Sequence, residues 1–202
     1  MPTRRGPAPS YDREAVLDAL MMLFWEQGYE ATSQADMIKR AGISSSSLYS
    51  AFGNKPDVLA AVLDRYTAMS HAQLGGLRDG DGGLADIEAF LQGVADASRF
   101  GQIPPGCLMV RTMTELGGRK EPLDTEPYTT RYHNQIEEAV RAALTRAAER
   151  GEIEPASVNA KASLVTSVFL GALAVSISDA ARGASMLDGG RLTVASWRTT
   201  AS

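Results

Sequence analysis

Apolar residues recur at helical spacing along nearly the whole chain, and this pattern restricts the fold more than any other feature. Val16, Leu20 and Phe24 form one such stripe, which Gly28 ends. Alternation of apolar and polar residues, which would indicate strands, is almost absent. Segments that contain glycine or proline separate the helical runs. The sequence therefore predicts an all-α protein.

About nine helices are expected, with very short turns between the first four and the clearest break at the glycine-rich loop 75–83. Serine or asparagine stands where three of the early helices begin, and Asp36 follows Ser33 at capping-box spacing. The expected helices lie near residues 11–27, 33–41, 44–52, from 54 onward, 84–101, 106–117, 124–150, 156–182 and 188–199.

The segment AGIS, residues 41–44, joins the second and third expected helices through a turn of three to four residues that contains glycine. This connection is typical of a helix-turn-helix, whose second helix enters the DNA major groove by its N-terminal end. Leu48 and Phe52 would hold that helix against the other two. A serine run alone usually indicates a linker, but in this setting Ser44–Ser47 would form a contact surface, because hydroxyls donate to phosphate oxygens and base edges.

With these spacings in place, LFWEQGYEATSQADMIKRAGISSSSLYSAFGNKPDVL resembles the N-terminal DNA-binding domain of tetracycline-repressor-type (TetR family) transcriptional regulators. The matching features are Phe24 followed by Gly28 and Tyr29, the Thr32-Ser33 pair, the IKRAGIS helix and turn, and LYSAF followed by Lys55. The resemblance covers residues 13 to 66 or so. The rest of the chain is similar to that family only in length and helical layout.

The resemblance implies two sets of DNA contacts. Phosphate contacts are expected from Thr32, Ser33, Ser47, Tyr49 and Lys55. Base reading is expected from Ser45, Ser46 and Ser50. The residues themselves add Ser44, which with Ser47 lies at a helix N-terminus, where free backbone N–H groups favour phosphate.

One departure from the family concerns charge. The expected recognition helix contains no Lys or Arg, and residues 1–55 carry six basic and six acidic groups. With a net charge of −4 for the chain, DNA binding would depend on local placement of charge. Arg4 and Arg5 are expected to compensate as a flexible arm that reaches the DNA backbone or minor groove. Deleting residues 1–9 should then flatten the salt dependence of binding.

Other chemistry is weakly represented. His71 and His133 are the only histidines, and neither has a second ligand at metal-binding spacing, so no metal or cofactor is expected. No nucleophile motif or convergent set of titratable groups indicates an enzyme. The single cysteine, Cys107, excludes an internal disulfide. Its place at the start of an expected helix would allow a lowered thiol pKa, but a buried, inert cysteine is the favoured interpretation.

Two sets of C-terminal residues are candidates for a ligand cavity and for dimerisation. Methionine and aromatic side chains suit an adaptable apolar cavity between helices. The candidate pocket residues are Phe90, Phe100, Met109, Met113, Tyr128, Tyr132 and Phe169. A stripe of small residues in the apolar 156–182 helix permits close approach of another helix, and the resemblance implies a dimeric four-helix bundle there. Its members are Ser167, Gly171, Ala174 and Ser178.

We therefore predict a homodimeric regulator with a DNA-binding domain at residues 11–53 and a ligand-sensing and dimerisation domain at 54–202. The resemblance implies a repressor that a small apolar ligand releases from a palindromic operator of double-stranded DNA, as the fourth helix moves. An activator of the same fold, or a helix-turn-helix that binds protein, are the alternatives. A cytoplasmic location is expected, because the N-terminus lacks a secretory signal and residues 162–178 are too short and too polar for a membrane span.

Overall fold

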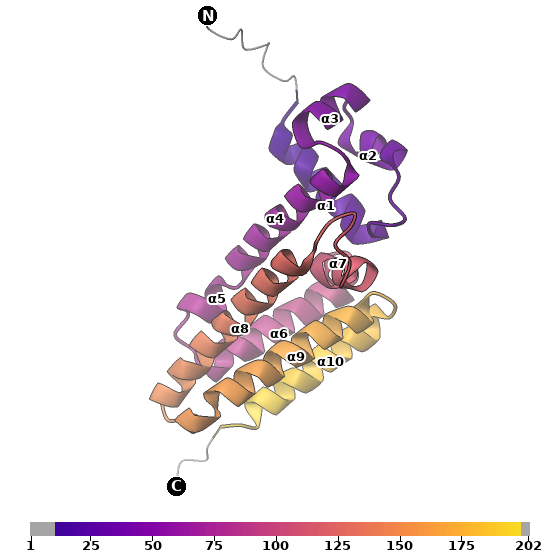
Figure 1. The fold of residues 1–202 in the computed structure, drawn as a ribbon. Coiled ribbons are helices and arrows are strands. Elements are labelled where there is room, and N and C mark those ends of the chain that lie inside the picture. The colour runs from indigo at the N-terminus through magenta and orange to yellow at the C-terminus, as the bar shows by residue number, and fades with distance from the viewer. Residues whose placement is uncertain (1–10, 199–202) are drawn as a thin grey trace, which may run out of the picture.

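The computed structural model describes residues 11–198, and that part of the chain is helical throughout with short connections, which confirms the all-α prediction (Figure 1). The elements are α1 (Arg13–Gln27), α2 (Gln34–Ala41), α3 (Ser45–Phe52), α4 (Lys55–Gln73), α5 (Gly75–Asp79), α6 (Leu84–Arg99), α7 (Leu108–Leu116), α8 (Glu126–Glu149), a 3-10 helix (Pro155–Ser157), α9 (Val158–Ser176) and α10 (Ala180–Ala195).

The helices form two parts (Figure 1). Helices α1, α2 and α3 gather at one end of the molecule, and we call them the three-helix unit. Helix α4 leads from this unit into a bundle in which the long helices α6, α8, α9 and α10 run alongside one another. Within that bundle α10 packs against both α6 and α9, and α8 packs against α9. Helix α7 is short and lies where the bundle meets the three-helix unit.

Side-chain caps begin each of the first four helices. Asp12 accepts from the backbone N–H of Glu14 at 2.9 Å at the start of α1. The predicted capping box of α2 is present, because Ser33 and Asp36 each accept from the other's backbone N–H. Ser44 caps α3, and Asn54 forms a second capping box that begins α4. These bonds satisfy N–H groups that a helix start leaves unpaired.

The three-helix unit has its own core. Leu20, Phe24, Met37 and Leu48 are completely buried, and Phe52 is nearly so. They come from all three helices, so the stripe of α1 and the inward face of α3 meet as the sequence predicts. Full burial of four large side chains is the main stabilising contribution within this unit, at about 1.5–3 kcal/mol each.

Helix boundaries differ from the prediction in two places. The predicted loop at 75–83 contains α5, so residues 11–198 form ten α-helices. The predicted 156–182 helix ends at Ser176, and α10 begins at Ala180, earlier than the predicted 188–199 helix. Asp179 caps α10 by accepting from the backbone N–H of Arg182. Gly183 makes the reversal possible, because a Cβ there would lie 1.8 Å from the Ser176 hydroxyl oxygen.

One segment within residues 11–198, Pro155–Ser176, has the length and apolar composition of a helix that could cross a membrane. The core helix of a soluble protein satisfies the same criteria. In this fold α9 packs between α8 and α10 and buries one face, with residues from Ala162 to Ser176, against them, while other residues of the helix are exposed.

Candidate nucleic-acid interface and ligand cavity

Helices α2 and α3 are joined by the expected sharp turn. Gly42 ends α2 with φ 65° and ψ 21°, in the left-handed region that favours glycine, and its N–H donates to the Ile38 carbonyl at 3.0 Å. Ser44 then caps α3 by accepting from the Ser47 N–H at 3.2 Å. The inward residues Leu48 and Phe52 determine which face of α3 is turned outward.

The outward face of α3 is a surface of serine hydroxyls. Ser44, Ser45, Ser46 and Ser50 are exposed, and Ser47 is half-buried. The Ser44 hydroxyl lies 3.0 Å from that of Ser46 and donates to that of Ser47 at 2.9 Å. The hydroxyls at the start of α3 are therefore held close together beside the free N–H groups of the helix.

Tyr49 extends from the same helix but is half-buried. Its hydroxyl oxygen is buried and has no hydrogen-bond partner among residues 11–198. Most buried polar atoms in folded proteins are paired. The Tyr49 hydroxyl is an exception to this rule among the described residues.

Two of the predicted phosphate contacts have internal hydrogen bonds instead. Thr32 is only 1% exposed, and its hydroxyl donates to the Gly28 carbonyl at 2.6 Å. The position of Thr32 therefore differs from the prediction, because its hydroxyl proton points into the protein. Ser33 is exposed, but its hydroxyl donates to Asp36 at 2.6 Å and lowers the pKa of that carboxyl. Arg4 and Arg5 lie outside the described residues.

Lys55 opens α4 next to the α1–α2 connection. Its ammonium nitrogen lies 4.1 Å from the centroid of the Tyr29 ring, a cation–π contact. Partial burial lowers the pKa of Lys55, while the nearby carboxylates of Glu30 and Glu115 act in the opposite direction. The charge is therefore positioned by the protein rather than left on a freely moving chain.

Glu115, near the end of α7, connects the bundle to the three-helix unit. Its carboxylate accepts from the backbone N–H of Tyr29 at 2.7 Å and of Glu30 at 3.1 Å. We call this contact the α7 clamp. Gly28 permits it, because a Cβ at that position would lie 1.9 Å from a Glu115 carboxylate oxygen. Arg119 adds an exposed ion pair with Glu30 at 3.0 Å.

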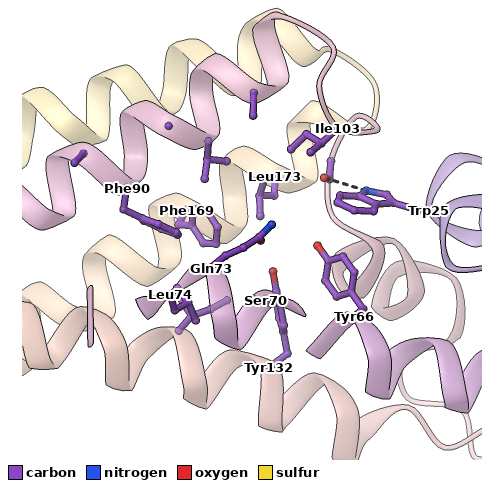
Figure 2. Close-up of a pocket in the computed structure, with 16 residues that line it drawn as sticks. Trp25, Tyr66, Ser70, Gln73, Leu74, Phe90, Ile103, Tyr132, Phe169 and Leu173 are labelled. Atoms are coloured by element: carbon purple, nitrogen blue, oxygen red, sulfur yellow. Dashed lines mark hydrogen bonds between the residues drawn. The ribbon is translucent and has the colours of Figure 1, made fainter. Parts of the chain in front are cut away.

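A cavity of about 340 Å³ lies within the bundle, and we call it the central cavity (Figure 2). It is bounded by residues of α1, α4, α6, α8 and α9 and of the segment before α7. Phe90 and Phe169 form one wall, with ring centroids 5.0 Å apart. The lining residues are Trp25, Tyr66, Ser70, Gln73, Leu74, Ala89, Phe90, Gly93, Val94, Ala97, Ile103, Gly106, Tyr132, Ile136, Phe169 and Leu173.

The structure places the seven candidate pocket residues in different surroundings. Phe90, Tyr132 and Phe169 line the central cavity. Met109 and Met113, again with Tyr132, line a separate groove of about 310 Å³ between α7, α8 and α9. Tyr128 is half-buried beside Arg131. Phe100 is 72% exposed at the end of α6, so its prediction as a pocket residue is wrong.

Thirteen of the 16 lining residues were not among the candidates, and four of these are Trp25, Tyr66, Ser70 and Gln73. The last three follow one another at spacings of four and three residues on α4. Polar residues that continue an otherwise apolar inner stripe are a signal for a cavity, since a close-packed core leaves them no partners. Trp25 gave no such signal, because it belongs to a helix of the three-helix unit.

Cys107 is buried directly before α7, between two tyrosines. The Tyr66 hydroxyl donates to its sulfur at 3.2 Å, and the thiol donates to the Tyr132 hydroxyl at 3.3 Å. Burial raises the pKa of the Cys107 thiol and raises the pKa values of both tyrosines well above their ordinary range. The thiol therefore belongs to a neutral, internally paired network.

The predicted small-residue stripe lies on the outer surface of α9. Ser167, Ala174 and Ser178 are exposed, and Gly171 is half-buried. Leu164 on the same helix is 48% exposed. An apolar groove of about 380 Å³ between α6, α9 and α10 continues this surface past Met186 and Trp197. We call this region the α9–α10 face.

Within residues 11–198 no group of three or more His, Cys, Asp or Glu side chains is arranged to hold a metal ion. His71 lies 2.7 Å from an Arg78 guanidinium nitrogen. His133 lies 3.8 Å from Glu137. Both histidines are on exposed helix surfaces.

Comparisons with known proteins give consistent matches over both parts of the chain. A family model for bacterial regulatory proteins of the tetR family matches residues 16–62, and a tetracyclin repressor-like C-terminal domain model matches residues 83–184. The HTH-type transcriptional repressor ComR of Escherichia coli K12 is 35% identical over 156 residues, which are 75% of this chain and 72% of ComR.

Two solved structures share the fold at low identity. The TetR family regulator CifR, as a cysteine mutant complexed with a 26 bp operator, has a TM-score of 0.78 and 22% identity, over 95% of this chain and 100% of CifR. Reduced NemR of E. coli has a TM-score of 0.79 and 21% identity, over 94% of this chain and 98% of NemR.

Proposed function

Because this chain belongs to the TetR family of bacterial transcriptional regulators, we propose that it is a homodimeric repressor that a small apolar ligand releases from its operator. The observation that carries the proposal is the outward face of α3, where exposed serine hydroxyls are grouped at the N-terminal end of the second helix of a helix-turn-helix. As bacterial transcriptional regulators act on the chromosome, we place this one in the cytoplasm.

In the proposed complex α3 enters the major groove and the surrounding groups hold the DNA backbone. Base edges are read by Ser45, Ser46 and Ser50. Phosphates are bound by Ser44 and Ser47 beside the free N–H groups of α3 and by the positioned charge of Lys55. Ser33 and Tyr49 join them once the Ser33 hydroxyl leaves Asp36 and the buried Tyr49 hydroxyl turns outward. Thr32 supports this surface by holding the turn at Gly28.

Dimerisation would take place through the α9–α10 face. Leu164 and Met186 are exposed there, among small residues that allow helices to approach closely. A two-fold axis through this face would present two copies of α3 to half-sites about one DNA turn apart. That geometry explains why a palindromic operator is expected.

Ligand release requires a cavity that communicates with the three-helix unit. The central cavity has walls from α4, which continues directly from that unit, and from Gly106, which precedes α7. The α7 clamp then binds α7 to the α1–α2 connection. A ligand that prefers one arrangement of α4 and α7 would change the spacing of the recognition helices.

Selection of bound duplexes from a random DNA pool at two salt concentrations tests the proposal. We expect a palindrome with half-sites about one turn apart. Failure to enrich any sequence with refolded, ligand-free protein would contradict operator binding.

The lack of Lys and Arg in α3 favours one alternative, a helix-turn-helix that binds a protein partner. Substitutions distinguish the two possibilities. Tyr49→Ala and Lys55→Ala should both weaken a DNA reader, whereas a protein-binding surface formed by the serines would be insensitive to these two changes.

A further inference from the structure

The central cavity has a lining without charge. Its 16 lining residues, all within the described part of the chain, include no Asp, Glu, Lys, Arg or His. A charged ligand would lose its hydration there without gaining an ion-pairing partner, which is costly. The cavity therefore selects against anions, and it offers no carboxylate to pair with a cation.

Most of its polar groups are already paired within the protein. The Tyr66 hydroxyl donates to Cys107, and Cys107 in turn donates to Tyr132. The indole N–H of Trp25 donates to the Gly106 carbonyl at 3.3 Å. These groups shape the cavity but have little hydrogen-bonding capacity left for a ligand.

Gln73 is different. Figure 2 shows its side chain extending from the end of α4 into the middle of the cavity, toward Leu173. Gln73 is an exposed residue, and its amide makes no hydrogen bond to another described residue. A primary amide offers two donors and an acceptor, so it can pair with a carbonyl, a hydroxyl or an N–H group.

The opposite wall is aromatic. The rings of Phe90 and Phe169 lie at 48° to one another with centroids 5.0 Å apart. On the other side of the cavity, the ring centroids of Tyr66 and Tyr132 are 5.7 Å from each other. Ring systems pack well against such faces. A volume of about 340 Å³ lies near the lower end of the range for ligand pockets, which favours a compact molecule.

We propose that the central cavity binds an uncharged, largely aromatic molecule whose rings pack against Phe90 and Phe169 and whose single carbonyl, hydroxyl or N–H group pairs with Gln73. This inference rests on the proposed function, because it names the class of ligand that would release the operator. The apolar grooves beside α9 are assigned to the dimer interface instead, as both include residues of the α9–α10 face or of the small-residue stripe.

The position of Trp25 gives such a ligand direct access to the DNA-binding part of the protein. Trp25 belongs to α1, yet it lines the cavity and packs edge-on against Tyr66 at 5.1 Å. A ligand in the cavity thus touches a side chain of the three-helix unit itself. Trp25 alone would therefore connect a ligand in the central cavity to the three-helix unit.

Two fluorescent probes with one ring system test this assignment. N-phenyl-1-naphthylamine is uncharged and carries an N–H group, and 8-anilinonaphthalene-1-sulfonate adds a negative charge to the same rings. The chain contains two tryptophans, so Trp197→Phe leaves Trp25 as the sole indole reporter. We expect the uncharged probe to quench Trp25 emission, and the sulfonate to bind at least about tenfold more weakly.

Variants locate the probe. Gly93 lines the cavity and has open space where a Cβ would lie, so Gly93→Leu should fill the cavity and abolish binding of the uncharged probe. Gly76→Leu is the matched control, because Gly76 is also helical with open space but does not line the cavity. Gln73→Leu should weaken binding by about five- to tenfold. Circular dichroism and thermal unfolding verify that each variant folds.

The assignment is overturned if the uncharged probe fails to bind, if the sulfonate binds as tightly, or if folded Gly93→Leu retains binding. These measurements need no DNA. A separate titration of the selected operator, with and without saturating uncharged probe, tests ligand release. An operator that stays bound would contradict the proposed release mechanism while leaving the chemistry of the cavity supported by the binding data.

Discussion

The surroundings of Lys55 affect its proposed contact with DNA. Its ammonium group lies over the Tyr29 ring, and the carboxylates of Glu30 and Glu115 are close enough to affect its pKa. The charge is therefore pre-positioned, and little conformational entropy is lost when a phosphate binds it. The same carboxylates compete with phosphate for the lysine, so its contribution depends on the state of the α1–α2 connection.

Replacing this lysine should change the salt dependence of operator binding. For Lys55→Ala, the slope of log K against log salt should become shallower by about 0.9 per lost phosphate contact, or roughly 1.8 for a dimer. Fluorescence anisotropy at several salt concentrations measures this slope. Lys120→Ala is the control, because it removes an equal charge that is paired with Asp124 and Glu126 in the bundle. An unchanged slope for Lys55→Ala would remove it from the interface.

Cys107 should be unreactive in the folded protein. Burial raises the pKa of its thiol, so less of the nucleophilic thiolate is present at a given pH, and Cys107 as a whole residue is 1% exposed. We expect labelling by a disulfide reagent at pH 8 to be at least about a hundredfold slower in native than in denatured protein. Rapid labelling of native protein would show that the network with Tyr66 and Tyr132 opens readily.

The raised pKa also predicts a loss of stability in alkali. The stabilising effect of a neutral thiol is fully present below the pKa of the unfolded chain. It is lost as pH rises from that value through the higher pKa of the folded state. Urea unfolding between pH 7 and 10 should show this decline, and the decline should be smaller in Cys107→Ala.

At the scale of single helices, α7 has two ends with different partners. Its first residue, Leu108, follows Gly106 and Cys107 beside the central cavity, and its penultimate residue, Glu115, forms the α7 clamp. The two ends are connected by a helix of only nine residues, which transmits displacement without bending. A shift of α7 along its axis would therefore act on the α1–α2 connection directly.

Removing the clamp should loosen that connection. For Glu115→Ala we expect a free energy of unfolding lower by about 1–2 kcal/mol, because two hydrogen bonds to a carboxylate are lost at a partly exposed site. Hydrogen exchange measured by NMR should accelerate at the amides of Tyr29 and Glu30. Glu149→Ala is the control, because it removes the same kind of side chain at an exposed position. Unchanged exchange at both amides would mean that other contacts hold the connection.

Prediction from sequence succeeded for local chemistry and failed where distant parts of the chain meet. The capping box at Ser33 and Asp36, the glycine turn at Gly42 and the inward Leu48 each depend on neighbours a few residues away. Phe100 was mistaken for a pocket residue because periodicity cannot show that a helix end protrudes. Ser178 lies within the reversal between α9 and α10 and Gly183 lies just after it, and this reversal depends on contact between the two helices.

The candidate DNA surface and the central cavity show the same difference between local features and contacts that are distant in sequence. The resemblance to the TetR family implied that Thr32 binds phosphate, whereas its hydroxyl is bonded to the Gly28 carbonyl. Trp25 was missed as a cavity residue because its partners, Tyr66 and Gly106, lie 41 and 81 residues further along the chain. No local pattern encodes such a contact.

At the scale of the whole molecule, a charge introduced on the α9–α10 face tests whether this face forms the dimer interface. Ala174 is exposed in one protomer, so Ala174→Glu should leave the protomer folded, but in a dimer it would place two carboxylates close to the two-fold axis. Light scattering with size-exclusion chromatography should show monomers, and operator affinity should fall by at least about a hundredfold. Ala72→Glu, at an exposed alanine of α4, is the control. A dimer that survives Ala174→Glu would place the interface elsewhere.

The hydrogen bond between Trp25 and Gly106 also has a consequence during synthesis. Its partners are separated by 81 residues, and the α7 clamp spans 86. At about 5–20 residues per second, a ribosome needs roughly 4–16 s to make Gly106 after Trp25. During that interval the nascent three-helix unit depends on its own caps and on its own buried leucines and phenylalanine. In every newly made copy the helices of the three-helix unit are thus synthesised before the part that is proposed to regulate them.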